Sequence, residues 1–166
     1  LTGWVCVVDE NSAVPASEVY GVKEGNIHVV GQPFGYMRTA DKYGDYKFHA
    51  EWRWVGEGTN SGIFHRVQDG DKIWPNAIEC QLCSGKAGDY VMLGGSKISD
   101  IECVGEFPVK DRVGDYEKPI GEWNEADIVC QGGKITVYIN GQLQNECTTN
   151  TTEGYIALQS EGGPIE

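Results

Sequence analysis

Apolar and polar residues alternate along several stretches of the chain, and residues 46–54 show this pattern most clearly. Every second side chain there is aromatic or alanine, and the side chains between them are charged or histidine. A period of two residues is typical of a β-strand with one face in a core. The pattern therefore predicts a strand that turns His49, Glu51 and Arg53 away from the core.

Near the C-terminus the chain contains three strand-like segments joined by turns of two residues. Residues 127–131 and 134–139 flank Gly132-Gly133, and Asn140-Gly141 leads into residues 142–144. Both pairs tolerate the positive φ angles that tight hairpin turns require. The three segments are therefore predicted to form an antiparallel meander.

Further short apolar runs, bounded by Gly, Pro, Asn or Asp, are also predicted to be strands. They are Asn26–Val30, Gly62–Val67, Asn76–Leu82 and Tyr155–Gln159, with weaker signals at Tyr90–Leu93 and Ile101–Val104. No segment sustains the 3.6-residue period of a long helix. Many short strands with regular turn signals indicate one all-β domain over residues 1–166, a jelly-roll β-sandwich of two antiparallel sheets.

Charge and hydropathy narrow the range of partners. The 166 residues include 13 Lys and Arg against 25 Asp and Glu, a formal net charge of −12. This acidity argues against a nucleic-acid partner, because binding to phosphates needs clustered Lys and Arg. No apolar run approaches the roughly 20 residues of a membrane-spanning helix, and no signal peptide opens the chain. We expect no nucleic acid partner and no membrane insertion, and the oligomeric state stays open.

Six cysteines raise the question of a metal or redox site. Cys80 and Cys83 form a CxxC pair, a spacing that zinc and redox sites use. No second CxxC or close His pair completes a metal site, and the pair ends a strand-like run instead of opening a helix. We interpret the cysteines as structural thiols and expect neither a metal nor another cofactor.

Strand parity selects a few polar residues as candidates for a functional site. If Ile78 and Cys80 are buried, Glu79 and Gln81 project together from the opposite face of their strand. By the same argument Glu51 lies on the side of its strand that faces away from the core.

Two other predicted strands contribute further candidates. In residues 63–66 the parity is ambiguous, because either His65 or Arg66 could turn outward. In residues 155–159, burial of Ile156 and Leu158 turns Gln159 to the other face. A sheet bent into a trough would bring several of these side chains together on its concave face.

Such a set of side chains suits a sugar. Carboxylates and amides bind hydroxyl groups, a guanidinium binds oxygen acceptors, and rings such as Trp74 or Tyr36 cover the apolar faces of pyranose rings. The alternative is an ordinary solvated sheet face, on which charged residues also alternate with apolar ones. Glu79 stands out because its neighbours are apolar, and an apolar surround raises the pKa of a carboxylate into a range useful for acid–base catalysis.

Several blocks, in order along the chain, resemble one known family, the 3-keto-disaccharide hydrolase domain family. The blocks are residues 33–39, 43–54, 60–66, 73–82, 87–89, 121–124, 140–141 and 154–159. This resemblance implies a concanavalin A-like, lectin- and glucanase-type jelly roll. It also implies an exported bacterial protein, periplasmic or secreted, that cleaves glycosides already oxidised to a ketone at C3. The family's usual last strand has no match after Gly163-Pro164.

The resemblance carries over to individual residues. It implies that Glu79 and Glu51 are catalytic, and it extends the substrate-binding set. It implies binding roles for Arg66, Gln81 and Gln159, and it places Glu161 where the family usually has a His. Strand parity and ring chemistry add His65 and Trp74 to the binding set.

Two classes of function follow from these candidates. In the first, a carboxylate removes the acidic C2 hydrogen of a 3-keto glycoside, with Glu79 preferred over Glu51, and Arg66 and Gln81 stabilise the enolate oxygen. A variant is two-carboxylate hydrolysis by Glu51 and Glu79, in which their separation decides the stereochemistry. In the second class the same trough is a non-catalytic carbohydrate-binding module. In both classes the partner is an oligosaccharide or another glycoside.

Overall fold

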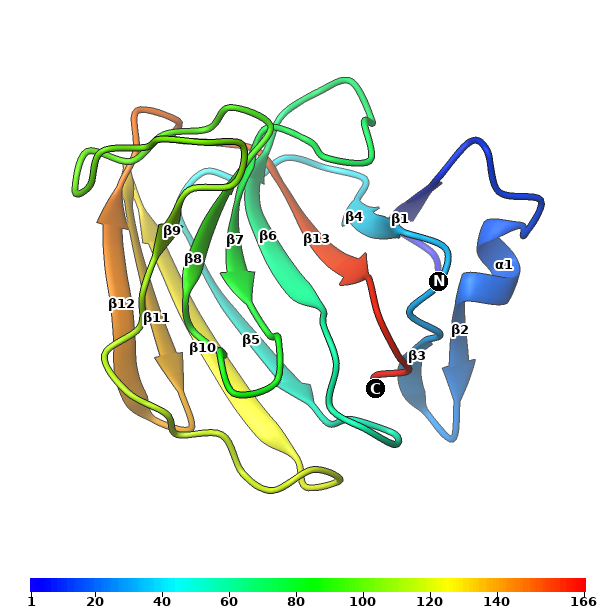
Figure 1. Ribbon diagram of the computed structural model, residues 1–166. Helices are drawn as coiled ribbons and strands as arrows, with labels where there is room; N and C mark the ends of the chain where they lie inside the picture. Colours follow the sequence, from blue (N-terminus) through cyan, green and yellow to red (C-terminus); the bar gives the residue numbers. More distant parts are fainter.

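Two antiparallel β-sheets face each other in the computed structural model, which describes residues 1–166 (Figure 1). The larger sheet has seven strands in the order β1 (Trp4–Val8), β4 (Gly35–Thr39), β13 (Tyr155–Ser160), β6 (Gly62–Val67), β7 (Ala77–Gln81), β8 (Tyr90–Leu93) and β9 (Val109–Lys110). The smaller sheet has the order β12 (Gln142–Thr148), β11 (Lys134–Ile139), β10 (Asn124–Gln131) and β5 (Tyr46–Trp52). A hairpin of β2 (Tyr20–Lys23) and β3 (Asn26–Val29) follows the one short helix, α1 (Ala16–Val19). The predicted all-β sandwich is confirmed.

The predicted meander is confirmed in detail. β10 pairs with β11 and β11 with β12, both antiparallel. Asn140 and Gly141 have φ angles of 49° and 76°, as a tight turn with two positive φ angles requires. β5 adds to the other edge of β10, with its predicted outward residues on the solvent side.

Between the sheets lies a main core of 23 buried residues to which both sheets contribute. Ile78 and Cys80 of β7 point into it, as does Ile156 of β13. Their strand neighbours therefore point to the outer face of the seven-stranded sheet. The parity predicted for β7 and β13 is confirmed.

The outer face of the seven-stranded sheet is itself largely covered. A second cluster of seven buried residues lies there, and Trp74 packs against it. Its members are Tyr36, Phe64, Val67, Ala77, Val91, Leu93 and Ala157. The connections β6–β7 (68–76) and β8–β9 (94–108) both extend from the same end of this sheet (Figure 1). This second cluster surrounds the candidate site.

Two expectations about strands need correction. Ile101–Val104 forms no strand, because Ile101 and Cys103 pack singly against the main core while β9 already pairs with the edge of β8. The strands β1 and β4 were not predicted, since Gly35–Thr39 does not alternate. No helix of the structure is long and apolar enough to cross a membrane.

Candidate active site

Glu79 lies in the middle of β7 on the outer face of the large sheet. It sits opposite Phe64 of β6 and Val91 of β8, and only 2% of its surface is exposed. Burial raises the pKa of the Glu79 carboxyl well above its usual value, and the negative charge of Glu161 raises it further. Burial therefore favours the protonated form of Glu79, in contrast to an ordinary surface glutamate.

Glu161 forms a hydrogen-bonded pair with Gln159 beside this carboxyl. The Nε2 group of Gln159 donates to Glu161 Oε2 over 2.7 Å. Burial raises the pKa of Glu161, whereas hydrogen bonds from Asn60 and Gln159 lower it. Glu161 therefore ionises more readily than Glu79, so the two carboxyl groups of the site differ in acidity.

Several polar atoms on this face are buried without any hydrogen-bond partner. They are Oε1 of Glu79, Oε1 of Gln159, Oδ1 of Asn60 and the hydroxyl of Tyr36. A buried polar atom without a partner costs about 1–3 kcal/mol, and native proteins contain few of them. Two of these four atoms, the amide oxygens of Gln159 and Asn60, can only accept, as a ligand with several hydroxyl groups requires.

Gly62 makes room for the carboxyl group of Glu79. A Cβ built on Gly62 would lie within 2.8 Å of three side-chain atoms of Glu79. Gly62 is paired with Gln81, two residues after Glu79 on β7. The carboxyl of Glu79 therefore lies over β6 and points toward β13, the strand that carries Gln159.

Gln81 is anchored in a way that leaves one end of its amide available. Its Oε1 accepts hydrogen bonds from the backbone N–H groups of Leu82 and Cys83, at 3.0 and 2.9 Å. Its Nε2 donates to no protein atom. Gln81 can therefore offer two N–H donors to a ligand next to Glu79.

Three aromatic side chains from separate connections meet near this face. Trp74 packs between Phe34 and Phe107, with ring centroids 5.9 and 5.4 Å away. Phe34 and Phe107 remain 38% and 40% exposed. We call these three residues the aromatic shelf. Trp74, which was proposed from the sequence as a sugar-binding ring, packs against the second cluster.

The structure separates Glu51 from Glu79. Glu51 lies on the solvent-exposed face of β5 in the small sheet, near His49, while Glu79 lies on the outer face of the large sheet. The main core lies between the two sheets, which in such sandwiches pack about 10 Å apart. A catalytic pair of Glu51 and Glu79 is therefore ruled out, and Glu161 is the second carboxyl of the site.

His65 and Arg66 also lie away from the site, and neither turns outward. His65 is fully buried and contacts the hydroxyl of Tyr46 through Nδ1 at 2.8 Å, and burial together with the charge of Arg66 lowers the pKa of His65 to about 3. The guanidinium of Arg66 donates to the backbone carbonyls of Tyr43, Gly44 and Gly132. Both residues support the fold, and we remove them from the binding set.

The sequence did not single out Asn60 or Gly62 as site residues. It also did not predict that the outer face of the large sheet is largely buried. Asn60 and Gly62 flank Ser61, within one of the blocks that carry the resemblance, which is the only signal that could have found them. No group of three or more His, Cys, Asp or Glu side chains is arranged to hold a metal ion. A cavity of about 790 Å³ between the sheets, beside β5, is lined mostly by apolar residues and does not include Glu79.

Comparison with known proteins relates the chain to carbohydrate-active proteins. A family model, the 3-keto-alpha-glucoside-1,2-lyase-like domain, matches residues 1–166. A 3-keto-disaccharide hydrolase of Bacteroides thetaiotaomicron is 24% identical over an alignment of 173 positions, and the match covers 79% of this chain. The matched region spans 59% of that relative's length.

Solved structures share the fold at low identity. A candidate glycosyl hydrolase of Parabacteroides distasonis has a TM-score of 0.71 and 18% identity, covering 99% of this chain and 84% of its own. The carbohydrate-binding module CBM66 of Bacillus subtilis has a TM-score of 0.67 and 10% identity, covering 99% and 91%. A β-glucanase of Bacillus licheniformis has a TM-score of 0.64 and 16% identity, covering 98% and 81%. Because hydrolases and a binding module share this fold, the fold leaves the function open.

Proposed function

We propose a function for this chain from one premise: it belongs to the family of 3-keto-alpha-glucoside-1,2-lyase-like domains. The proposal is that the outer face of the large sheet cleaves glycosides whose sugar is oxidised to a ketone at C3. The observation that carries it is the buried, unpartnered carboxyl of Glu79 beside the Glu161–Gln159 pair. An acid and a base at one site are what such a cleavage needs.

The ketone explains why the two carboxyl groups of Glu79 and Glu161 suffice to cleave the glycosidic bond. A carbonyl at C3 makes the C2 hydrogen acidic, so that a carboxylate can remove it. Glu161 is the base, because it ionises more readily than Glu79. The electron pair of the C2–H bond moves into an enolate at C2–C3, and the Nε2 group of Gln81 donates to the enolate oxygen.

Glu79 then acts as the acid. The enolate expels the substituent at C1, and Glu79 gives its proton to the departing oxygen. Water adds to C1 of the resulting enone while Glu79 takes a proton from that water and Glu161 returns its proton to C2. The net reaction is hydrolysis of the glycosidic bond. This reverses the role expected for Glu79 from the sequence, because burial favours the protonated form of its carboxyl before substrate binds.

The proposal is tested by turnover of 3-keto glycosides and of the same glycosides unoxidised. We expect release of the aglycone from the keto substrates only, and loss of that release in Glu79→Gln. Glu51→Gln is the matched control, since it removes an exposed carboxylate from the other sheet. Cleavage of the unoxidised parents at a similar rate would contradict the proposal. Binding of sugars without turnover would instead favour a non-catalytic carbohydrate-binding module.

A further inference from the structure

Along the strands of the outer face, polar side chains give way to apolar ones. At one end lie Glu161 and the register pair Gln159–Tyr36, all with polar atoms near the site. At the other end β7 and β8 bring Ala77 opposite Leu93, and both side chains are buried and apolar. Glu79 lies between these two ends, opposite Val91.

Phe107 of the aromatic shelf lies at the apolar end, whereas Phe34 precedes Gly35, which pairs with Ser160 next to Glu161. Phe107 lies two residues before Val109, which pairs with Val91 in the same row of the sheet as Glu79. Adjacent strands are about 4.8 Å apart, so the backbone at Val109 is roughly 10 Å from that at Glu79. Val109 is exposed, as is much of Phe107. An apolar surface therefore begins two strands away from the backbone of Glu79, on the side opposite to β6.

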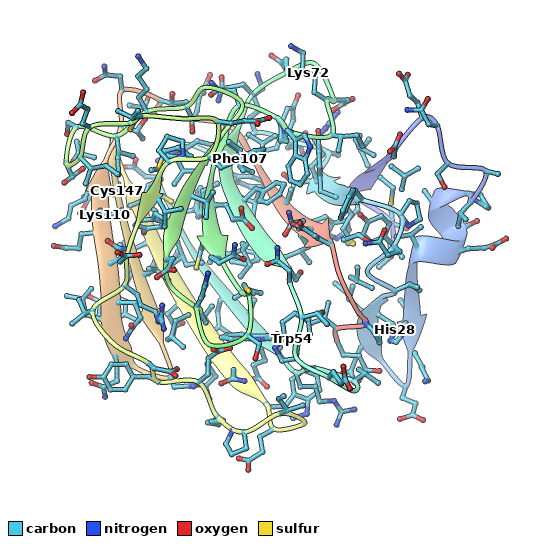
Figure 2. All side chains as sticks on the ribbon, viewed as in Figure 1. His28, Trp54, Lys72, Phe107, Lys110 and Cys147 are labelled. Atoms are coloured by element: carbon cyan, nitrogen blue, oxygen red, sulfur yellow. The ribbon has the colours of Figure 1, made fainter.

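Two ion pairs fix the segment that carries Trp74. Arg38 of β4 binds Asp71 through Nε at 2.7 Å, and Lys42 binds Asp69 at 2.7 Å. Both acidic residues precede Trp74 in the β6–β7 connection. Figure 2 labels Lys72 in this connection and Phe107 at the same end of the large sheet. The shelf is thus held in place before any ligand binds, as preorganised sites require.

We propose that the aromatic shelf binds the aglycone of the glycoside and gives the site a preference for an aromatic one. This rests on the proposed function, because it assigns the oxidised sugar to the polar end and the scissile bond to Glu79. A second sugar ring would need hydrogen-bond partners for its hydroxyl groups. The side chains that frame this end are Trp74, Phe107 and Val109, which favours a planar apolar group.

The test compares 3-keto-glucosides of 2-phenylethanol and of ethanol, in both anomers. These alcohols are similar leaving groups, so the ratio of their kcat/KM values reports on binding of the phenyl ring. Burial of a phenyl group predicts a ratio of about ten- to a hundredfold in the wild-type protein. Trp74→Leu and Phe107→Leu are expected to bring the ratio close to one.

Tyr116→Leu is the matched control, because Tyr116 is an exposed aromatic residue outside the shelf, and it should keep the wild-type ratio. Each variant provides its own folding control, since the ethyl substrate is measured in the same preparation. Turnover of both substrates with a ratio near one in the wild type would overturn the shelf assignment and leave the proposed function intact. Turnover of neither would overturn the proposed function. In that case calorimetric binding of the unoxidised phenylethyl and ethyl glucosides decides for or against the shelf.

Discussion

The carboxyl group of Glu79 occupies the space in which a side chain on Gly62 would begin. Glu79 Oε1 is the nearest atom to a Cβ built at Gly62, and two further atoms of Glu79 lie within 2.8 Å of it. The absence of a side chain on one strand thus sets the position of the acid on the next. The two residues act as one unit in the proposed site.

Gly62→Ala is therefore expected to displace Glu79 and to reduce turnover of 3-keto glycosides strongly. The φ angle of Gly62 is not in the left-handed region, so alanine fits the backbone. The colliding atoms are the end of a flexible side chain, which limits the loss of stability. We expect a fall in kcat of about 10²-fold or more, as for the loss of one acid–base group. Unchanged kcat in the alanine variant would show that the carboxyl of Glu79 need not lie over Gly62.

Glu79→Gln is expected to change how stability depends on pH. The pKa of Glu79 is raised by burial from its usual 4.5, so the folded state binds one more proton than the unfolded state at pH values between the two pKa values. In that window the free energy of unfolding of the wild type falls as pH rises, by about 1.4 kcal/mol per pH unit.

Glutamine does not ionise, so the Glu79→Gln variant should lack this fall. Urea unfolding at pH of about 4, 6 and 8 measures the difference. We expect the stability of the variant relative to the wild type to increase from the lowest to the highest pH. A constant difference across this range would mean that Glu79 titrates in the folded protein as it does in the unfolded chain.

The activity should follow a bell-shaped pH profile, with Glu161 ionised and Glu79 protonated in the active form. Hydrogen bonding from Gln159 lowers the pKa of Glu161. Gln159→Met removes this donor, so the acid limb of kcat/KM is expected to move to higher pH. Movement of the alkaline limb alone would reverse the roles of the two glutamates.

Arg66 is expected to matter for folding and not for substrate binding. Its guanidinium is the partner of three backbone carbonyls in a nearly fully buried position. Arg66→Met should lower the free energy of unfolding by roughly 3 kcal/mol or more, because it leaves those carbonyls unpaired. Lys23→Met, at an exposed position, is the control and should stay within about 0.5 kcal/mol of wild type. A raised KM with unchanged stability in Arg66→Met would return Arg66 to the site.

Alternation along the strands was enough to predict which face Glu79, Gln81 and Gln159 occupy. Parity assigns a side chain to one face of its own sheet, but it does not say which strands belong to the same sheet. Glu51 was correctly predicted to lie on the side of β5 away from the core, yet its strand belongs to the other sheet. The pairing of Glu51 with Glu79 failed for that reason.

Two other features depend on tertiary structure that alternation does not encode. Arg66 has a φ of 57°, and this irregularity in β6 ends the alternation, so that His65 and Arg66 are both buried. The burial of Glu79 arises on a face where Trp74 of the β6–β7 connection packs against the second cluster. Alternation alone marks such a glutamate as solvent-facing, whereas its apolar neighbours and the packing of a distant segment raise its pKa.

The most direct test of the account is aglycone release from a 3-keto-glucoside carrying deuterium at C2, measured beside the protium substrate and the unoxidised parent. If Glu161 removes the C2 hydrogen, the deuterated substrate should react more slowly, and the unoxidised parent should not react. Glu161→Gln should abolish release from both keto substrates. Equal rates from the deuterated substrate, the protium substrate and the unoxidised parent, with deuterium fully retained at C2, would contradict the account.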